Sequence, residues 1–276
     1  MASFSVNTNS GAMLALQNLS KTQADLMTTQ NRISSGLKVA TAQDNGAVYA
    51  IAQNQRATSN AYNAVKDSLQ RSQSTVDVAT TAGAAVSDLL IQMKEKALAA
   101  SDSSLSAAGR SAMNADFTAL RDQITKVVSN ANFNGKNMIK AGGDTIAAIA
   151  TSTGGLITVA AQDLSLTSTT LTGITATTAI TTATLAGTAS TALDTAIEKV
   201  SLALSKLGTG SKSLGIHLDF VNKLQDAIDV GVGNMVDANY EREAARLTAL
   251  QTKQQLGFQA LSIANNSTGS LLSLFR

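Results

Sequence analysis

Cysteine and proline are both absent from the 276 residues of this chain, and each absence excludes specific chemistry. Without cysteine there is no disulfide, no thiolate nucleophile and no cysteine-ligated zinc or iron–sulfur centre. An average chain of this length would carry about 14 prolines, and each of them can slow folding by cis–trans isomerisation. Export in an unfolded state accounts for both absences, because neither cross-links nor slow isomerisation could then interfere.

Side chains that usually build catalytic sites are also scarce. His217 is the single histidine, which excludes a cage of several histidines and an H-E-x-x-H zinc site. We interpret it as a half-buried structural residue, because it directly precedes the apolar Leu218. The acidic residues on the expected helices occur singly, and we interpret them as solvated surface: Asp67, Asp77, Asp88, Asp102 and Asp116. We therefore predict no catalytic, cofactor-binding or metal-binding residue, and no enzyme activity.

The charge balance and hydropathy exclude two further classes of partner. The chain carries 21 Lys+Arg against 19 Asp+Glu, a net charge of +2 that is too even to imply a nucleic acid or an anionic membrane surface. No stretch approaches the ~18 uninterrupted apolar residues of a membrane span, so no membrane insertion is expected. The first 20 residues lack a basic segment followed by an apolar run, so no cleavable secretory signal is expected.

Apolar residues recur at alternating spacings of three and four, which is the pattern of a coiled coil. The predicted helices cover residues 14–37, 48–100, 113–127, 193–235 and 247–275. The second of them would be about 80 Å long at 1.5 Å per residue, with Ile51 near the start of its apolar stripe. In the fourth, Gly208, Gly210 and Gly215 are each expected to weaken the helix by about 1 kcal/mol relative to alanine.

The composition changes abruptly between residues 145 and 193. Asp163 is the only charged residue of these 49, and 16 of them are threonine. The sequence Ser-Thr-Gly-Gly at 152–155 is typical of a hairpin turn, and the apolar residues 156–159 favour a strand after it. We predict a β-hairpin followed by irregular or strand-like surface, and a disordered low-complexity insert is the alternative.

Helical arms with matching apolar spacings at the two ends of a chain most simply pair with each other. The predicted fold class is mainly α: a long antiparallel coiled-coil-like helical rod with paired terminal helices and a small β-rich central region. Both ends are poor in charge, with polar Gln23 and Gln254 inside their apolar stripes. Such ends either fold when chains assemble or pack as ordinary amphipathic helices within their own domain.

Short sequences at both ends resemble those of bacterial flagellins. In the N-terminal part they are SVNTN at 5–9, RISSGLK at 32–38 and AQDNGA at 42–47. In the C-terminal part they are VDANY at 236–240, LQTKQQLG at 250–257 and LSLFR at 272–276. Together with the helical arms, the resemblance accounts for residues 1–140 and 190–276, and it is greatest to the short flagellins of alphaproteobacteria.

The resemblance implies a structural subunit that polymerises with itself into the flagellar filament and so enables swimming. It also implies export in an unfolded state by the flagellar type III apparatus, without a cleaved signal, to an extracellular location. Expected partners are further copies of the chain, the flagellar cap, hook-associated proteins, an export chaperone and the export apparatus. Residues 1–40 and 236–276 would form the inner core of the filament, 41–140 and 190–235 its outer core, and 141–189 its surface.

Mutual burial of apolar side chains among neighbouring subunits would drive this assembly. The residues expected at the subunit interface are Leu16, Leu19, Leu26, Ile33, Leu37, Leu250, Leu261, Leu271 and Phe275. A hook–filament junction adaptor, which shares the terminal helices but forms a bounded ring, is the alternative function. O-linked glycans on exposed threonines between Thr167 and Thr191 are left open.

Overall fold

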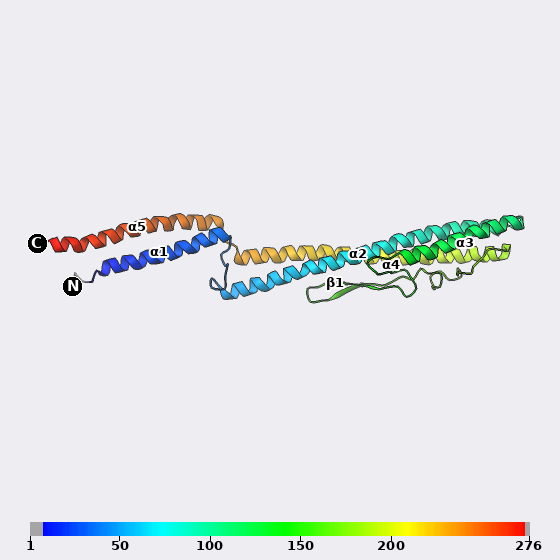
Figure 1. Ribbon diagram of the computed structural model, residues 1–276, viewed down its shortest axis with the longest axis horizontal. Coiled ribbons are helices and arrows are strands. Elements are labelled where there is room, and N and C mark those ends of the chain that lie inside the picture. The colour runs from blue at the N-terminus through cyan, green and yellow to red at the C-terminus, as the bar shows by residue number, and fades with distance from the viewer. Residues whose placement is uncertain (1–7, 274–276) are drawn as a thin grey trace. The chain divides into compact units, whose positions relative to one another are not determined.

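The computed structural model describes residues 8–273, with side chains described through residue 266. The regular elements of these residues are helices and one short hairpin. In order they are α1 (Ser10–Ser35), α2 (Gly46–Ala100), α3 (Ala107–Asn130), β1 (Ile146–Ile149), β2 (Leu156–Val159), α4 (Ala183–Val236) and α5 (Tyr240–Ser273) (Figure 1). The predicted mainly α fold with a central hairpin is confirmed. The chain divides into a terminal unit, residues 1–57 and 227–276, and a central unit, residues 58–226.

Polar side chains explain where four of the helices begin. In each case a side-chain oxygen accepts a hydrogen bond, 3.0 to 3.1 Å long, from a backbone N–H in the first turn. These capping residues are Asn9 for α1, Asn45 for α2, Ser106 for α3 and Asn239 for α5. At the other end of α1, Gly36 takes a left-handed conformation with φ of 72°, which glycine adopts without a Cβ penalty.

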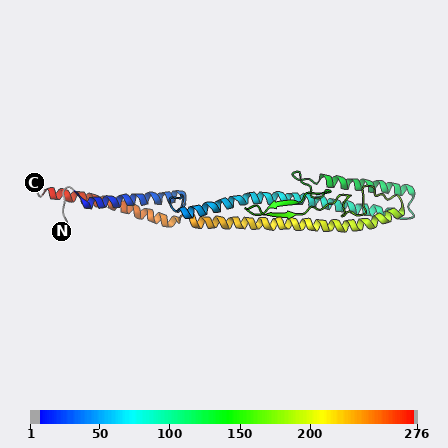
Figure 2. The same cartoon turned by 90° about the horizontal axis from the view of Figure 1, so that it is seen from below.

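In the central unit, α2 and α4 run beside each other in opposite directions, with α3 alongside (Figures 1 and 2). Polar contacts between α2 and α4 show that the two helices are antiparallel. Residues with higher numbers on α2 contact residues with lower numbers on α4. In that order the contacts are Lys66 with Gln225, Asp77 with Ser211, and Lys94 with Asp194.

The apolar stripes predicted from the spacing form the core of the central unit. Buried members on α2 are Val65, Leu69, Val76, Val86, Leu90 and Met93, and those on α4 are Leu193, Val200, Leu207, Leu214 and Val221. In the part of α2 that belongs to the terminal unit, the predicted stripe is wrong at Ile51. Ile51 is 50% exposed, whereas its neighbour Ala52 is 1% exposed. Near its start, α2 packs Ala52 into a separate small cluster with Val39, Val232 and Val236. Because of this packing, the face of α2 that carries Ala52 is buried there and the face that carries Ile51 is exposed.

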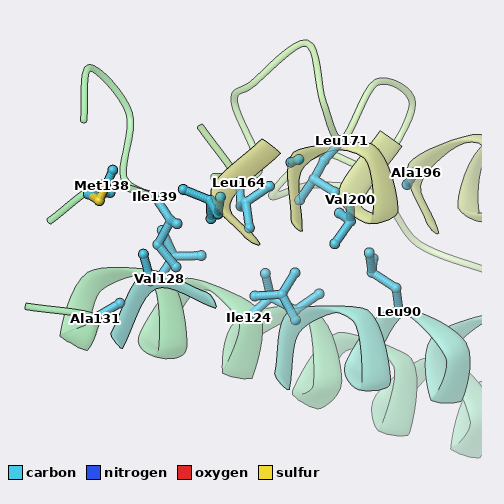
Figure 3. Close-up of a cluster of buried hydrophobic side chains, with 14 of the residues drawn as sticks. Leu90, Ile124, Val128, Ala131, Met138, Ile139, Leu164, Leu171, Ala196 and Val200 are labelled. Carbon is cyan, nitrogen blue, oxygen red and sulfur yellow. The ribbon is translucent and has the colours of Figure 1, made fainter. Parts of the chain in front are cut away.

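The threonine-rich segment packs against the helices, so the alternative of a disordered insert is wrong. Its backbone between β2 and α4 is irregular, as predicted, but its apolar side chains join the helical core: Leu164, Leu166, Leu171, Ile174 and Ile180. Figure 3 shows Leu164 and Leu171 beside Val200 of α4, with Ile124 of α3 and Leu90 of α2 facing them. The segment is therefore an irregular cover for the helical core.

The beginning of α4 lies earlier than the spacing indicated. The first stripe residue is Leu193, but the helix begins at Ala183, within the segment expected to be irregular surface. The Thr182 hydroxyl accepts a hydrogen bond of 3.2 Å from the backbone N–H of Leu185, which is the bond of a helix N-cap. Alanines at 183, 186, 189 and 192 favour the helix enough to outweigh the threonines between them.

The single histidine is a half-buried structural residue, as predicted. His217 of α4 places Nε2 2.7 Å from the carbonyl oxygen of Ala150, directly after β1. Its ring lies 5.8 Å from that of Phe220 on the same helix. His217 therefore links α4 to the hairpin. The five aspartates interpreted as solvated surface are all exposed, which confirms that interpretation.

Asn137 and Asp144 hold the loop that leads from α3 into the hairpin. Asn137 is buried, and its amide donates to the Val128 carbonyl at 2.7 Å while its Oδ1 accepts from the backbone of Ile139. The Asp144 carboxylate accepts a hydrogen bond of 3.1 Å from the backbone N–H of Asn137. This bond, together with a bond and the positive charge from Lys136, lowers the pKa of Asp144 from 3.8 to about 2.

We predict that this loop loses a stabilising contribution only in strong acid. Because the folded pKa of Asp144 lies below its ordinary value, the contribution is complete above pH 3.8 and is lost as the pH falls through about 2. The carboxyl carbon resonance of Asp144, followed by NMR, should titrate near pH 2. In Asp144→Asn the amide resonance of Asn137 should lose its response over this range, and a midpoint at or above 3.8 would contradict the account.

Two glycines of α4 should respond in opposite ways to alanine. A Cβ on Gly210 would lie 2.5 Å from Val159 Cγ1 of the hairpin, whereas one on Gly208 would meet nothing within 4 Å. Gly208→Ala should therefore stabilise the chain by up to about 1 kcal/mol through helix propensity. Gly210→Ala should destabilise it by about 1–3 kcal/mol through overpacking. Urea unfolding followed by circular dichroism measures both, and equal shifts would refute the assigned role of Val159.

Candidate assembly interface

The first and last helices pack on each other in antiparallel order within one chain. They lie side by side in both views (Figures 1 and 2). The Asn9 amide donates to the Ala264 carbonyl at 2.7 Å, and the Tyr240 hydroxyl donates to the Ile33 carbonyl at 2.6 Å. The described parts of both ends are thus amphipathic helices packed in their own unit, which was one of the two alternatives for them.

The residues predicted to mediate assembly fall into three groups by exposure. Buried between α1 and α5, at 7–9% exposure, are Leu19, Leu26 and Leu250. Half-buried residues are Ile33, Leu37 and Leu261. Leu16 is exposed at 57%. Leu271 lies in α5 beyond the described side chains, and Phe275 lies outside the described residues.

Further large apolar side chains on α1 and α5 are exposed. With exposed fractions of 55–71%, they are Met13, Leu14, Met27, Leu256, Phe258 and Ile263. They are absent from the predicted interface residues, because those residues were chosen along a single apolar stripe. The signal for them is a second set of apolar residues, on the same helices but off the stripe. Charge on α1 is confined to Lys21, Asp25 and Arg32, so association could bury the exposed apolar side chains of α1 with little charge desolvation.

A partly buried ion pair joins the two helices near the end of α1. Arg32 Nη1 lies 3.4 Å from Glu243 Oε1, and the two side chains are 26% and 10% exposed. Thr29, one turn before Arg32, is 1% exposed. Among the described residues, the buried side-chain nitrogen and oxygen atoms without a hydrogen-bond partner are Arg32 Nε and Glu243 Oε2. The contact between α1 and α5 therefore includes a charged pair near the end of α1, in addition to the hydrogen bonds of Asn9 and Tyr240.

A carboxylate organises the connection from α1 to α2. Asp44 Oδ2 accepts hydrogen bonds from the backbone N–H groups of Ala40 and Thr41, at 3.1 and 2.9 Å, and from the Thr41 hydroxyl at 3.1 Å. These bonds, with the backbone bond from Thr41 as the largest cause, lower the pKa of Asp44. The connection is therefore an ordered turn that fixes where α1 ends and α2 begins.

The described residues contain no group of three His, Asp or Glu side chains that could hold a metal ion. Within the same part of the chain, no helix combines the length and apolar character needed to cross a membrane. What the arrangement offers is apolar surface on a pair of helices with few charges. Exposed apolar surface of this kind is typical of helical proteins that bind other protein chains.

Comparisons with known proteins identify the family. Residues 6–143 match the bacterial flagellin N-terminal helical region, and residues 190–275 match the bacterial flagellin C-terminal helical region. The chain is 54% identical to flagellin FljO of Caulobacter vibrioides, over the full length of both chains. It is 36% identical to a flagellin of Brucella melitensis, with 99% of each chain covered. A crystal structure of Bacillus cereus flagellin matches 56% of this chain and 88% of that chain, at 26% identity and a TM-score of 0.49.

The chain belongs to the bacterial flagellin family. It is a structural subunit that polymerises with itself into the flagellar filament, and it is not an enzyme. The resemblance noted in the sequence is confirmed, including its likeness to alphaproteobacterial flagellins. Nothing in the comparisons favours the junction adaptor.

We predict that Leu26 and Leu16 differ in their effect on the stability of the isolated chain. Leu26→Ala removes a side chain buried between α1 and α5, which should cost about 2–5 kcal/mol. Leu16→Ala changes an exposed side chain and should alter stability by no more than about 0.5 kcal/mol. Amide hydrogen exchange in α1 and α5 of the monomer reports the local opening free energy, and equal effects would contradict the burial pattern.

Proposed function

We propose that α1 and α5 build the inner core of the filament by burying their exposed apolar side chains against other copies of the chain. The observation that carries this proposal is the set of large apolar residues on the two helices that are more than half exposed, Leu16, Met27 and Phe258 among them. Apolar surface gathered on two helices of low charge is typical of a protein–protein contact. Each buried side chain would contribute about 1.5–3 kcal/mol to assembly.

The predicted interface residues then divide between two roles. Leu19, Leu26 and Leu250 hold α1 against α5 within one chain and so shape the surface that is presented. Leu16, with the exposed residues that the sequence reasoning missed, makes the contacts between chains. Partly exposed or undescribed members complete the proposed contact set: Ile33, Leu37, Leu261, Leu271 and Phe275.

We assign the remaining segments to layers of the filament. Residues 1–40 and 236–276 form the inner core, 41–140 and 190–235 the outer core, and 141–189 the surface. Supporting the last assignment, the hairpin exposes Leu156 at 60%, and many hydroxyls of the threonine-rich segment are exposed. The first turns of α4, which begin at Ala183, would then lie at the outer surface.

We further propose that the chain reaches an extracellular filament by export in an unfolded state through the flagellar type III apparatus. The complete absence of cysteine and proline supports this, because an unfolded chain then meets neither cross-links nor slow isomerisation. An export chaperone, the flagellar cap and hook-associated proteins are the proposed partners on this route, and the family membership supports them.

Seeded polymerisation tests the assignment of the termini. Purified monomer is added to short filament seeds, and elongation is followed by sedimentation and negative-stain microscopy. The full chain should give long filaments, and a chain lacking residues 1–37 and 247–276 should give none. A full chain that decorates seed ends without extending them would refute the filament role in favour of a junction adaptor.

We predict that exposed apolar residues of the terminal helices matter for elongation but not for monomer stability. Leu16→Ser and Phe258→Ser, at sites 57% and 55% exposed, should slow seeded elongation at least about tenfold if each site loses 1.4 kcal/mol of contact energy. Leu156→Ser in β2, at a site 60% exposed, is the matched control and should elongate like the unmodified chain. Equal elongation of all three variants would refute the proposed contact surface.

A further inference from the structure

A pocket of about 370 Å³ opens between α2 and the segment that leads from α3 into β1. On the α2 side it is lined by hydroxyl side chains on successive turns, Ser68, Ser72 and Thr75. All three residues are more than nine-tenths buried, at 6–8% exposure. The turn at 133–136 and residues 145–147 line the rest of the pocket, which lies wholly within the central unit.

Ser72 occupies a place where the helical core would otherwise have an apolar side chain. At the buried stripe positions of α2 from Val65 to Ala100, it is the one polar side chain. It lines the pocket, and its hydroxyl has no hydrogen-bond partner among the described residues. A buried hydroxyl without a partner is destabilising, so the position of Ser72 indicates a partner that enters from the pocket.

A second hydroxyl beside it is also available to a ligand. Ser68 Oγ accepts a hydrogen bond of 3.0 Å from the backbone N–H of Ile149, so its own proton can still be donated. The Thr75 hydroxyl donates to the Arg71 carbonyl at 2.9 Å, which leaves it only as an acceptor. Ser68 and Ser72 therefore offer two O–H donors on adjacent turns of α2.

The charges that line the pocket are positive. They belong to Arg71 and Lys136, and the described lining contains no carboxylate. Lys136 is 3.0 Å from Asp144 Oδ1, so that carboxylate neutralises part of its charge. Arg71 is exposed and takes part in none of the ion pairs found among the described residues, although Asp67 lies one turn before it on α2. Arg71 is thus the cation available to a ligand.

We propose that this pocket binds a small tetrahedral oxyanion, of the class of sulfate and phosphate. The planar Arg71 guanidinium suits two oxygens of such an anion, and the Ser68 and Ser72 hydroxyls donate to the others. A bound anion joins α2 to the turn at 133–136 and to the start of β1. It therefore helps to hold the hairpin on the helix.

Titration of the full-length monomer with sodium sulfate and with sodium phosphate, followed by NMR, tests the site directly. Amide resonances of residues 68–75, 133–136 and 145–147, and the Nε–H resonance of Arg71, should shift along a 1:1 saturation curve. Sodium chloride at equal ionic strength is the reference, because it screens charges to the same extent. Sulfate and phosphate also strengthen apolar burial, so their concentrations are kept low and sedimentation checks that the chain stays monomeric.

Two variants change the proposed contacts, and a third is the matched control. Arg71→Gln and Ser72→Ala should each weaken sulfate binding at least about tenfold, as expected for a lost hydrogen bond to a charged group. Lys206→Gln removes an equal charge from an exposed position of α4 outside the pocket, and it should bind within about twofold of the unmodified chain. Where Ser72→Ala fails to fold by circular dichroism, Arg71→Gln decides, because Arg71 is exposed.

Acetate distinguishes a tetrahedral oxyanion from a carboxylate. It carries one charge and two oxygens, so it should bind at least about tenfold more weakly than sulfate. Acetate binding as tight as that of sulfate would overturn the assignment in favour of a carboxylate ligand.

Hydrogen exchange tests the proposed link to the hairpin. Because opening of the hairpin destroys the site, sulfate at ten times its dissociation constant should slow exchange of the β1 and β2 amides about tenfold. The same sulfate concentration should slow them equally in Lys206→Gln and far less in Arg71→Gln. Saturable binding without slower exchange would overturn the role of the anion in holding the hairpin.

Water is the competing occupant of the pocket, because it can satisfy a buried hydroxyl without any ion. Shifts that do not saturate, that chloride reproduces, or that Arg71→Gln leaves unchanged would overturn the proposal and assign the pocket to water. All of these measurements use the monomer. Failure of the chain to extend seeds would therefore refute the proposed function and leave the result on the pocket standing.

Discussion

Antiparallel packing between helices from the two halves of the chain is the constraint on which the other features depend. α2 against α4 forms the core of the central unit, and α1 against α5 forms the terminal unit. Neither helix of a pair could bury its apolar stripe alone. The hairpin and the threonine-rich segment have a helical surface to cover only because that packing exists. The terminal surface likewise has a defined shape only because α1 is held against α5.

Much of the fold could be predicted because coiled-coil spacing is a strong and long signal. The stripe from Val65 to Ala100 is buried at every step of three or four, and the turn after Thr151 was visible from its paired glycines. What the spacing could not give was the packing of irregular backbone. Leu164, Leu171 and Ile174 follow no period, so their burial depends on where α3 and α4 leave space, which only the three-dimensional arrangement determines.

The candidate interface was predictable in location but not in detail. The resemblance and the low charge pointed to both ends of the chain, yet a one-dimensional stripe cannot tell packing within a chain from packing between chains. Leu19 and Leu16 illustrate this, because both were assigned to assembly and only one is exposed. The pairing of Arg32 with Glu243 was also invisible, since the two residues are 211 positions apart and share no local pattern.

The threonine-rich cover has a consequence for the conditions in which the protein can work. Its one carboxylate, Asp163, accepts a hydrogen bond from the backbone N–H of Ser165, and its apolar residues are anchored in the helical core. Dissolved ions screen interactions between charges but leave contacts between uncharged groups nearly unchanged at moderate concentrations. Aliphatic contacts and hydroxyls hold this segment, and the charged Arg121 and Lys199 donate hydrogen bonds to its uncharged groups. The segment should therefore keep the same structure in fresh and in brackish water.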